Sequence, residues 1–407
     1  MREMVQPRQV IFPISVFQPW RHASANQDAI FSAKIAELTR LSGGLVLLGR
    51  ARTGIYLLVK HTISSSRRKV ILSPYTIPDV VNMVRFAGGE PVFVDCLPQS
   101  TNIDMDHLAT LMDNETCCIL LTHYHVNQQN TFDIVKICRE RDIYVFDDCA
   151  ISLGASMYGK PNGSFTDGSI FSFSGFKIMN FFWGGMISVN AKLILESIVD
   201  ETSKWPRLSS RQYARHAWTI TKFSVATSRL VFPILFQVRR FFIQHGTTQD
   251  IFPFTRVESK ELDQTILTRP SLTAVSEWTE KLKSIEFILS HRRMVARVYD
   301  EVLHDIAVSR ETNEEIRTTS SFMNYPIFVG SANRDRLYRE VMARGFDIGL
   351  SLYPNAHETT SFTGIAGASE NVSTLVRSIL TLPTHWRIDP GYARKLATCV
   401  RRLIKQS

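Results

Sequence analysis

A lysine, an aspartate and a serine between residues 145 and 185 could act together on one small molecule. Asp148 ends an apolar run, Ser172 lies in a Phe-Ser-Phe strand pattern, and Lys177 follows five residues later. A desolvated lysine can form a Schiff base with an aldehyde, an aspartate can pair with a protonated pyridine nitrogen, and a serine hydroxyl can bind phosphate. Pyridoxal phosphate (PLP) carries all three groups, so we expect it here. Taken singly, each residue also has an ordinary explanation: a surface lysine, a turn acid and a strand residue.

Strand and helix patterns alternate before this stretch. Strands are expected at 43–48, 69–74, 90–95, 118–122 and 143–147, and helices at 55–60, 79–87, 104–112 and 132–141. This alternation predicts a parallel sheet covered by helices on both faces. Ligands of such sheets bind at the carboxyl ends of the strands, so residues 73–76, 122–125 and 147–148 are expected around one crevice.

A turn of small and basic residues at 49–54, Gly-Arg-Ala-Arg-Thr-Gly, precedes the first of these helices. The unpaired N–H groups at a helix start suit a phosphate, and Arg52 would add positive charge. For this segment alone, an ordinary capped helix is an equally good explanation.

The last third of the chain has a different pattern. A long helix is expected at 272–303, a strand at 323–329, and helices at 333–344 and 390–405. The pattern predicts a smaller α+β domain. We therefore divide the chain into an N-terminal segment with a large domain (1–200), an insert (201–255) and a small C-terminal domain (256–407).

Composition narrows the class of protein. With 407 residues, 44% hydrophobic and 21% charged, the chain is typical of a globular enzyme. We identify no secretory signal and expect a cytoplasmic protein. The six cysteines are scattered without metal-ligand spacing, so neither a disulfide framework nor a metal site is expected.

The net charge of +9 comes almost entirely from one segment. Residues 202–249 contain eight basic residues and no acid, which leaves 39 basic against 38 acidic residues elsewhere. The basic charge is therefore a local feature and does not indicate a nucleic-acid partner.

The same segment predicts a basic amphipathic helix. On a helical projection five basic residues share a stripe, and apolar residues fall opposite; the basic residues are Arg207, Arg211, Arg215, Lys222 and Arg229. With Trp205, Trp218 and a Phe-rich tract, residues 205–243 suit a peripheral contact with the inner face of an anionic membrane. The alternative is that the apolar face packs on the protein or a dimer partner and the basic stripe is merely solvated.

Short motifs follow one another in a fixed order along almost the whole chain. They are Ser73-Pro74-Tyr75-Thr76 with Val80-Val81-Asn82, Ala87-Gly88-Gly89-Glu90-Pro91-Val92-Phe93-Val94-Asp95, Asn102-Ile103-Asp104, Asp148-Cys149-Ala150 through Leu153-Gly154-Ala155, Phe171-Ser172-Phe173 through Lys177 and Gly184-Gly185, and Leu382-Pro383-Thr384-His385. The set resembles the DegT/DnrJ/EryC1/StrS sugar aminotransferases, which are fold type I PLP enzymes of the aspartate aminotransferase superfamily. The resemblance implies a fold type I α/β large domain with a smaller C-terminal domain.

The resemblance also implies roles for individual residues. Lys177 would be the Schiff-base lysine and general acid/base, Asp148 the partner of the pyridine nitrogen, and Ser172 a phosphate ligand. Ala51 and Arg52 fall where relatives place phosphate-binding residues.

The implied reaction is a transamination. An amino acid, usually glutamate in this family, would load the cofactor, and a keto-sugar, normally nucleotide-linked, would receive the amino group. Glycan, polysaccharide or secondary-metabolite biosynthesis is the implied setting, and a homodimer with its site at the interface is the implied assembly. Some relatives have histidine in place of the lysine and are dehydratases; Lys177 argues against that branch.

The chain departs from the family pattern at several positions. Ile151 stands where relatives carry a glutamine or histidine that packs on the cofactor, and Ile77 where an aromatic residue often flanks the ring. Arg269, with Leu267 in the asparagine place, is the nearest equivalent of a motif that reaches the partner's phosphate. Apolar side chains can still enclose a ring by dispersion, so Ile77 and Ile151 remain expected cofactor contacts.

These departures keep a second function open. A weakly active or non-catalytic paralogue could act as a membrane-associated scaffold in glycan assembly.

The pocket for the sugar acceptor is the least defined part of the site. Tyr124, His125 and Tyr353 could line it, although each could equally serve packing alone.

Overall fold

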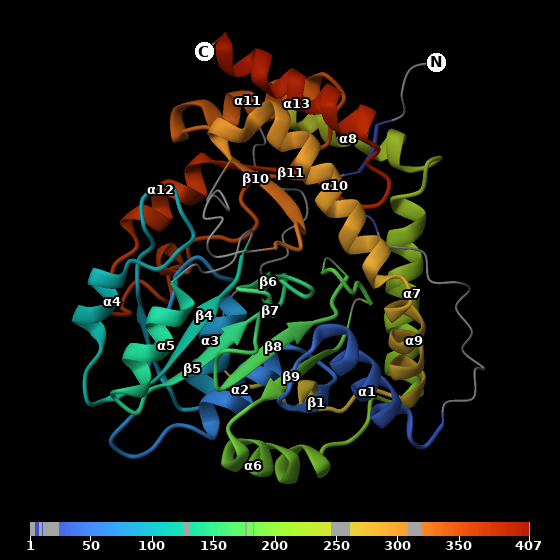
Figure 1. Ribbon diagram of the computed structural model, residues 1–407. Coiled ribbons are helices and arrows are strands. Elements are labelled where there is room, and N and C mark those ends of the chain that lie inside the picture. The colour runs from blue at the N-terminus through green and yellow to red at the C-terminus, as the bar shows by residue number, and fades with distance from the viewer. Residues whose placement is uncertain are drawn as a thin grey trace.

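The computed structural model describes residues 5–7, 10, 24–124, 130–175, 177–181, 183–245, 261–307 and 319–406 of the chain. A seven-stranded sheet with helices on both faces forms its larger part (Figure 1). In spatial order the strands are β1 (Gly44–Leu48), β9 (Gly185–Val189), β8 (Gly168–Ser172), β5 (Tyr144–Asp148), β4 (Thr116–Thr122), β2 (Lys69–Leu72) and β3 (Glu90–Phe93).

The sheet is mostly parallel, as the sequence predicted. The pairs from β8 to β3 are all parallel, whereas β9 runs antiparallel to both β8 and β1. The α/β fold class is confirmed. The antiparallel pairs at the β1 edge are an addition to the predicted pattern.

Side chains alternate between the two faces of the sheet, because successive strand residues point to opposite sides. In β2, Val70 and Leu72 join the core on one face and Ile71 joins the core on the other. The first face is covered by α2 (Arg52–Lys60), α3 (Pro78–Phe86) and α6 (Lys192–Ser203). The second face is covered by α4 (Met105–Leu111) and α5 (Thr131–Arg139) over β2 to β5, and by α1 (Gln27–Thr39) and α9 (Leu272–Leu282) over β1, β8 and β9.

A second, two-stranded antiparallel sheet organises the C-terminal part. It pairs β10 (Asn324–Phe328) with β11 (Ile379–Pro383). Its core includes side chains of α8 (Phe232–Gln244), α10 (Ile285–Leu303), α11 (Ser331–Ala343) and α13 (Pro390–Lys405). The remaining elements are α7 (Ser210–Ala226), α12 (Glu370–Ser378), the hairpin of β6 (Ser156–Met157) and β7 (Lys160–Pro161), and short 3-10 turns at Gln264–Ile266, His304–Ile306 and Ala356–Glu358.

One predicted helix is wrong as a single element. The expected helix at 272–303 is two helices, α9 and α10, with Lys283 and Ser284 between them. The break lets α9 pack against α1 beside the large sheet, while α10 continues to the core around β10 and β11. Local periodicity did not reveal this break because both helices are amphipathic.

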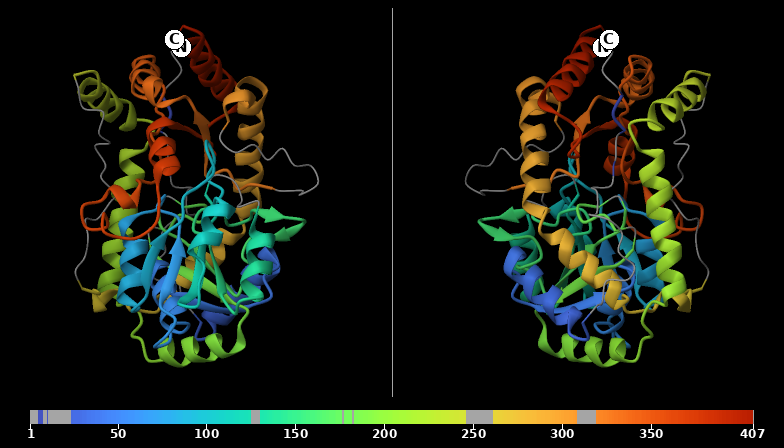
Figure 2. Two further views of the ribbon diagram at one scale, coloured as in Figure 1. Left: turned by 90° about the vertical axis from the view of Figure 1, so that its left-hand side faces the viewer. Right: turned by 90° about the vertical axis from the view of Figure 1, so that its right-hand side faces the viewer.

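The basic segment forms two helices, α7 and α8, which lie along the same side of the molecule (Figure 2). Arg207 precedes α7 and pairs with Asp28, so its predicted place on the helical stripe is wrong. Trp205 is buried in the core of the large sheet and is not available to a membrane. Among the helices of the described residues, none is both long and apolar enough to cross a bilayer.

Candidate active site

A cavity opens at the carboxyl ends of the parallel strands. Its empty volume is about 740 Å³, with the open mouth included. Thr122, Asp148 and Ser172, which end β4, β5 and β8, contribute to its lining together with Lys177. The structure therefore brings together the lysine, the aspartate and the serine that the sequence singled out.

Lys177 projects into this cavity from the loop between β8 and β9. The loop is held at its base by hydrogen bonds from Phe173 N to Gly184 O (3.0 Å) and from Phe181 N to Phe173 O (2.7 Å). Its own side chains Ile178 and Met179 are buried in the core below. Burial lowers the pKa of Lys177 to about 8, although the negative charge of Asp148 raises it. A larger fraction of this amine than of an ordinary lysine is therefore neutral and nucleophilic near physiological pH.

Asp148 lies at the end of β5 and is 7% exposed. Burial raises the pKa of its carboxyl group, while the backbone N–H of Ala150 and the charges of Lys177 and His123 lower it. The hydrogen bond from Ala150 N to Asp148 Oδ1 is 2.9 Å long. A carboxylate fixed in this way can accept a proton or a hydrogen bond from a ligand nitrogen.

A second buried acid supports the end of β5 from behind. Asp147 Oδ1 lies 3.0 Å from Nε2 of His123, and Gly163 N donates to Asp147 Oδ2 at 3.2 Å. The backbone N–H of His123 in turn donates to the carbonyl oxygen of Asp148 at 3.0 Å. With Cys149, these side chains could in geometry hold a metal ion. We assign Asp147 and His123 a role in positioning Asp148, since the backbone N–H of His123 holds the Asp148 carbonyl oxygen.

The N-terminus of α2 forms another wall of the cavity. Ala51 is the N-cap residue and has no side chain that could accept a hydrogen bond from the first turn. Gly185 lies against it, because a Cβ at Gly185 would come within 2.6 Å of the Cβ of Ala51. Ser172 ends β8 on the same cavity. A helix N-terminus with a hydroxyl beside it makes a suitable anion site.

Arg52 also lines the cavity, but its charge is shared. Its Nη1 lies 2.5 Å from Oδ2 of Asp79 in the first turn of α3. The sequence did not reveal that Arg50 lines the cavity as well, with its guanidinium 3.2 Å from the ring centroid of Trp183. Trp183 comes directly before Gly184-Gly185, and this position beside the motif is the only sequence signal for its place at the site.

The two isoleucines occupy different places. Ile77, the N-cap residue of α3, lines the cavity as expected. Ile151 is 1% exposed in the core beneath the lysine loop and is not among the cavity residues; Ala150 takes the place on the lining. An apolar contact with a ligand ring is therefore available from Ile77 and Ala150.

Three tyrosines meet next to the lysine. The hydroxyl of Tyr353 lies 3.3 Å from Nζ of Lys177, and the rings of Tyr75 and Tyr124 each lie 5.6 Å from the ring of Tyr353. Tyr353 lines the cavity, whereas Tyr124 packs behind it with 2% exposure. Burial raises the pKa of Tyr353, so its hydroxyl stays protonated and can donate a hydrogen bond. His125 lies outside the described residues.

The side chain of Arg269, expected to reach the phosphate of a partner subunit, is hydrogen-bonded within its own chain. Its Nε donates to the carbonyl oxygen of Trp205 at 3.2 Å, and its backbone pairs with Arg207.

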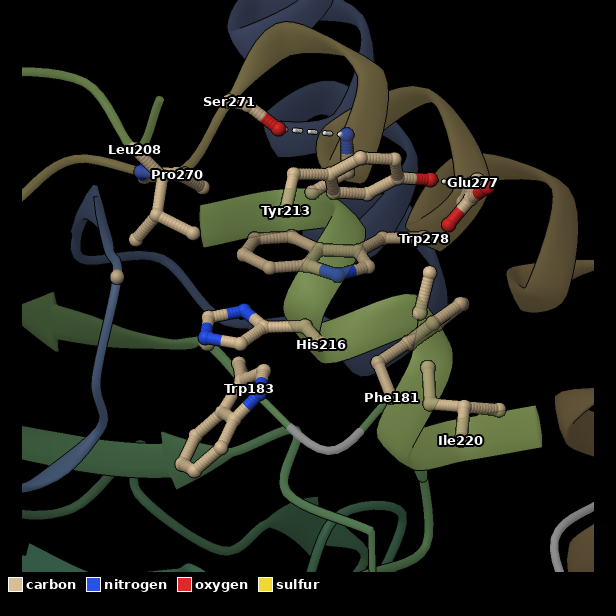
Figure 3. A pocket seen from close by; sticks show the side chains of 14 residues that line it. Phe181, Trp183, Leu208, Tyr213, His216, Ile220, Pro270, Ser271, Glu277 and Trp278 are labelled. Atoms are coloured by element: carbon tan, nitrogen blue, oxygen red, sulfur yellow. Dashed lines mark hydrogen bonds between the residues drawn. The ribbon is translucent and has the colours of Figure 1, made fainter. Parts of the chain in front are cut away.

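A second cavity, with an empty volume of about 420 Å³, lies beside the first between α7 and α9 (Figure 3). Trp183 and Gly184 line both cavities, and the indole of Trp183 faces the imidazole of His216 with the ring centroids 4.5 Å apart. Two of its polar groups are engaged with each other, since Tyr213 Oη donates to Glu277 at 2.5 Å. The lysine and the aspartate lie in the first cavity, and we place the chemistry there.

Comparison with known proteins agrees with this assignment. Residues 29–204 and 274–401 match the DegT/DnrJ/EryC1/StrS aminotransferase family. GDP-perosamine synthase of Escherichia coli O157:H7 is 28% identical over 183 residues, which are 44% of this chain and 48% of that protein. The dTDP-4-dehydro-2,3,6-trideoxy-D-glucose 4-aminotransferase of Saccharopolyspora spinosa is 22% identical over 87% of this chain and 82% of its own length.

An uncharacterized protein of Methanocaldococcus jannaschii, MJ1066, is 30% identical over 38% of this chain and 40% of its own length. The chain thus spans less than half of several curated relatives that it matches.

Solved structures share the fold. The aminotransferase TlmJ from Streptoalloteichus hindustanus superimposes with a TM-score of 0.72 at 19% identity, covering 94% of this chain and 92% of its own. PseC of Helicobacter pylori, an aminotransferase of pseudoaminic acid biosynthesis, gives 0.71 at 17% identity, covering 95% and 93%. The family match spans most of the chain on both sides of the 205–273 segment. The chain belongs to the DegT/DnrJ/EryC1/StrS aminotransferase family.

Proposed function

We propose that this protein is a PLP-dependent aminotransferase that moves an amino group from an amino acid, L-glutamate in the first instance, to a nucleotide-linked keto-sugar. The observation that carries the proposal is the placement of Lys177 and Asp148 in one cavity at the carboxyl ends of the strands. Lys177 is partly buried, and a lysine whose pKa is lowered to about 8 inside a cavity is a candidate for chemistry. This pair favours an enzyme over a non-catalytic scaffold.

The cavity fits PLP in its chemistry. Lys177 would take the aldehyde, Asp148 the pyridine nitrogen, and the N-terminus of α2 with Ser172 the phosphate. The close approach of Gly185 to Ala51 holds the start of α2 against β9 at that end of the cavity. The indole N–H of Trp183 is buried without an acceptor among the described residues, and an oxygen of the ligand would satisfy it.

The chemistry follows from these placements. PLP, when bound, supplies an electron sink that stabilises negative charge at the carbon of the reacting amine. Asp148 favours the protonated pyridine nitrogen, because its carboxylate is held by Ala150 N and backed by the pair of Asp147 and His123. Lys177 moves the proton at its Nζ, and the hydroxyl of Tyr353, 3.3 Å away, orients that nitrogen.

The substrate class rests on the relatives. GDP-perosamine synthase and the dTDP-sugar 4-aminotransferase are named for nucleotide sugars, and we propose the same class of acceptor for this chain. Tyr353, on the cavity lining, is the acceptor contact that we retain; Tyr124 supports it from behind. Glycan, polysaccharide or secondary-metabolite synthesis is the proposed setting.

We propose a homodimer as the working form. The family resemblance supports it. Arg269, the nearest equivalent of the residue that reaches the partner's phosphate in relatives, donates to the carbonyl oxygen of Trp205 in its own chain and adds no support for the dimer. We propose that the enzyme is cytoplasmic, with a peripheral contact at the inner face of the membrane through α7 and α8 and without the buried Trp205. That contact lies outside the cavity, so a test of membrane binding is independent of a test of the reaction.

An absorbance scan tests the enzyme proposal. PLP added to the purified protein is expected to give a visible band that the Lys177→Ala variant lacks, and L-glutamate is expected to deplete it. Lys177→Arg controls for loss of charge, because it keeps the cation and lacks the nucleophile. A protein that gives no visible band with saturating PLP is not a PLP aminotransferase.

A further inference from the structure

Helices α7 and α8 follow each other on one side of the molecule (Figure 2), outside the family-matched parts of the chain. Exposed side chains give α8 an apolar face and α7 a basic face. The sequence placed both properties on a single helix. The structure separates them, with the basic face on α7 and the apolar face on α8.

The outer face of α8 is apolar over its whole length. Five of its exposed side chains fall within about 120° of the helix circumference; they are Ile234, Leu235, Val238, Phe241 and Phe242. Their exposed fractions run from 43% for Leu235 to 67% for Ile234, and Leu230, just before the helix, is 86% exposed. Contiguous exposed apolar side chains of this kind mark an interaction site.

This face is not needed to hold α8 in place. The opposite side of the helix buries Phe236 and Ile243 in the core around β10 and β11. It also places Arg239 in a buried ion pair with Asp347 and in a 2.7 Å hydrogen bond to the hydroxyl of Tyr338. The helix is thus already anchored, and its outer face remains available for a partner.

The outer face of α7 is basic. Arg211, Arg215 and Lys222 are exposed on one side of the helix together with Trp218, and none of these cations forms an ion pair with another described residue. The inner side carries the buried Ala217 and a hydrogen bond from Tyr213 to Glu277. Between the helices, Thr227 is buried and its carbonyl oxygen accepts a hydrogen bond from Arg387, so the junction is fixed as well.

We infer that the outer faces of α7 and α8 together form a docking surface for an anionic lipid bilayer. The apolar side chains of α8 enter the interface, and the cations of α7 contact the headgroups. A bilayer offers hydrocarbon beneath a sheet of negative charge, which is the complement of these two faces. A second copy of the chain is a poorer partner, because a two-fold contact across this surface would bring basic faces close to each other.

Vesicle co-sedimentation with the full-length chain tests the inference. Vesicles of phosphatidylcholine with about one third phosphatidylserine are expected to bind the protein, and phosphatidylcholine alone to bind it much more weakly. Arg211→Glu/Arg215→Glu is expected to lower binding by at least about tenfold. Its matched control is Lys136→Glu/Lys192→Glu, an equal change of charge at exposed lysines of α5 and α6, which should bind as the wild type does.

A second pair of variants tests the apolar face. Phe241→Ser/Phe242→Ser is expected to lower vesicle binding strongly and to leave the unfolding temperature unchanged, because both side chains are exposed. Leu193→Ser/Phe287→Ser, at exposed positions of α6 and α10, is the matched control.

Equal binding to both kinds of vesicle, or no binding to either, would overturn the inference. If the Phe241/Phe242 variant instead changes only the concentration dependence of self-association measured by light scattering, the face belongs to a second copy of the chain. The visible band with PLP is measured on the same variants and should persist, so failure here is distinguishable from failure of the proposed enzyme.

Discussion

Lys177 and Asp148 illustrate how burial and charge oppose each other at a single site. Burial lowers the pKa of the lysine to about 8 and raises that of the aspartate, while each charge favours the ionised form of the other. Below its folded-state pKa the lysine is mostly protonated and its lone pair is occupied. Above that pKa the amine is free to attack.

The rate at which PLP reacts with the protein should therefore rise with pH through a midpoint near 8, well below the value of about 10.4 for a free lysine. Asp148→Asn should move the midpoint to lower pH, because it removes the charge that raises the pKa of Lys177. Stopped-flow absorbance across a pH series measures both midpoints. A wild-type midpoint near 10 would mean that Lys177 is solvated.

The sequence predicted residues of this site unevenly. Lys177, Asp148 and Ser172 could be chosen because each ends or follows a strand whose apolar pattern is visible. Ile151 was expected to contact the cofactor but is buried away from the cavity lining. The sequence could not separate these cases, since a buried position beneath a loop and a position facing a cavity have the same apolar signature. Trp183 and Arg50 come together only when β9 pairs with β1, a contact between distant parts of the chain that no local pattern encodes.

At the scale of elements, the cavity depends on the close approach of β9 to the start of α2. Gly185 allows this approach, because a Cβ there would lie 2.6 Å from both the Cβ of Ala51 and the carbonyl oxygen of Phe171. The carbonyl oxygen of Phe171 is a backbone atom and the Cβ of Ala51 is bonded directly to the backbone, so neither can move alone. The first turn of α2 would therefore have to shift.

Gly185→Ala is expected to weaken PLP binding by about tenfold or more and to cost about 1–3 kcal/mol of stability. Absorbance titration gives the affinity and denaturant unfolding the stability. Gly364→Ala is the matched control, because a Cβ at that position meets nothing within 4 Å. Unchanged affinity in Gly185→Ala would show that the α2 N-terminus does not hold the phosphate.

Elements were predicted better than their connections. The strand and helix alternation from 43 to 148 was confirmed, with element ends within about three residues of the prediction, because each element there has a clear period of its own. The basic segment was the poorest prediction. It was predicted as one basic amphipathic helix followed by a Phe-rich tract, whereas the structure has two helices, with the exposed cations on α7 and the exposed apolar side chains on α8.

At the scale of the whole molecule, the cavity joins the large sheet to the C-terminal part. Tyr353 reaches it from the segment between α11 and α12, and that segment is tied to the large sheet through Ala356 N to Pro74 O (2.7 Å) and Phe93 N to Ala366 O (2.8 Å). A ligand that contacts both Lys177 and Tyr353 would add a further link between the two parts.

Bound PLP should accordingly raise the unfolding temperature of the whole chain. At a concentration one hundred times its dissociation constant, the expected stabilisation is about 2.7 kcal/mol. Differential scanning fluorimetry measures it, with pyridoxal as the comparison, since that compound has the aldehyde and the ring nitrogen but no phosphate. Equal shifts for the two compounds would count against the anion site at α2.

The stacked side chains of Arg50, Trp183 and His216 cross from the family-matched part of the chain to α7. Deleting the segment that carries α7 would expose Trp183 and open the wall that separates the two cavities. A form of this protein engineered for work in free solution should therefore keep both helices and replace only their outward side chains. Truncation would alter the very site whose reaction it was meant to isolate.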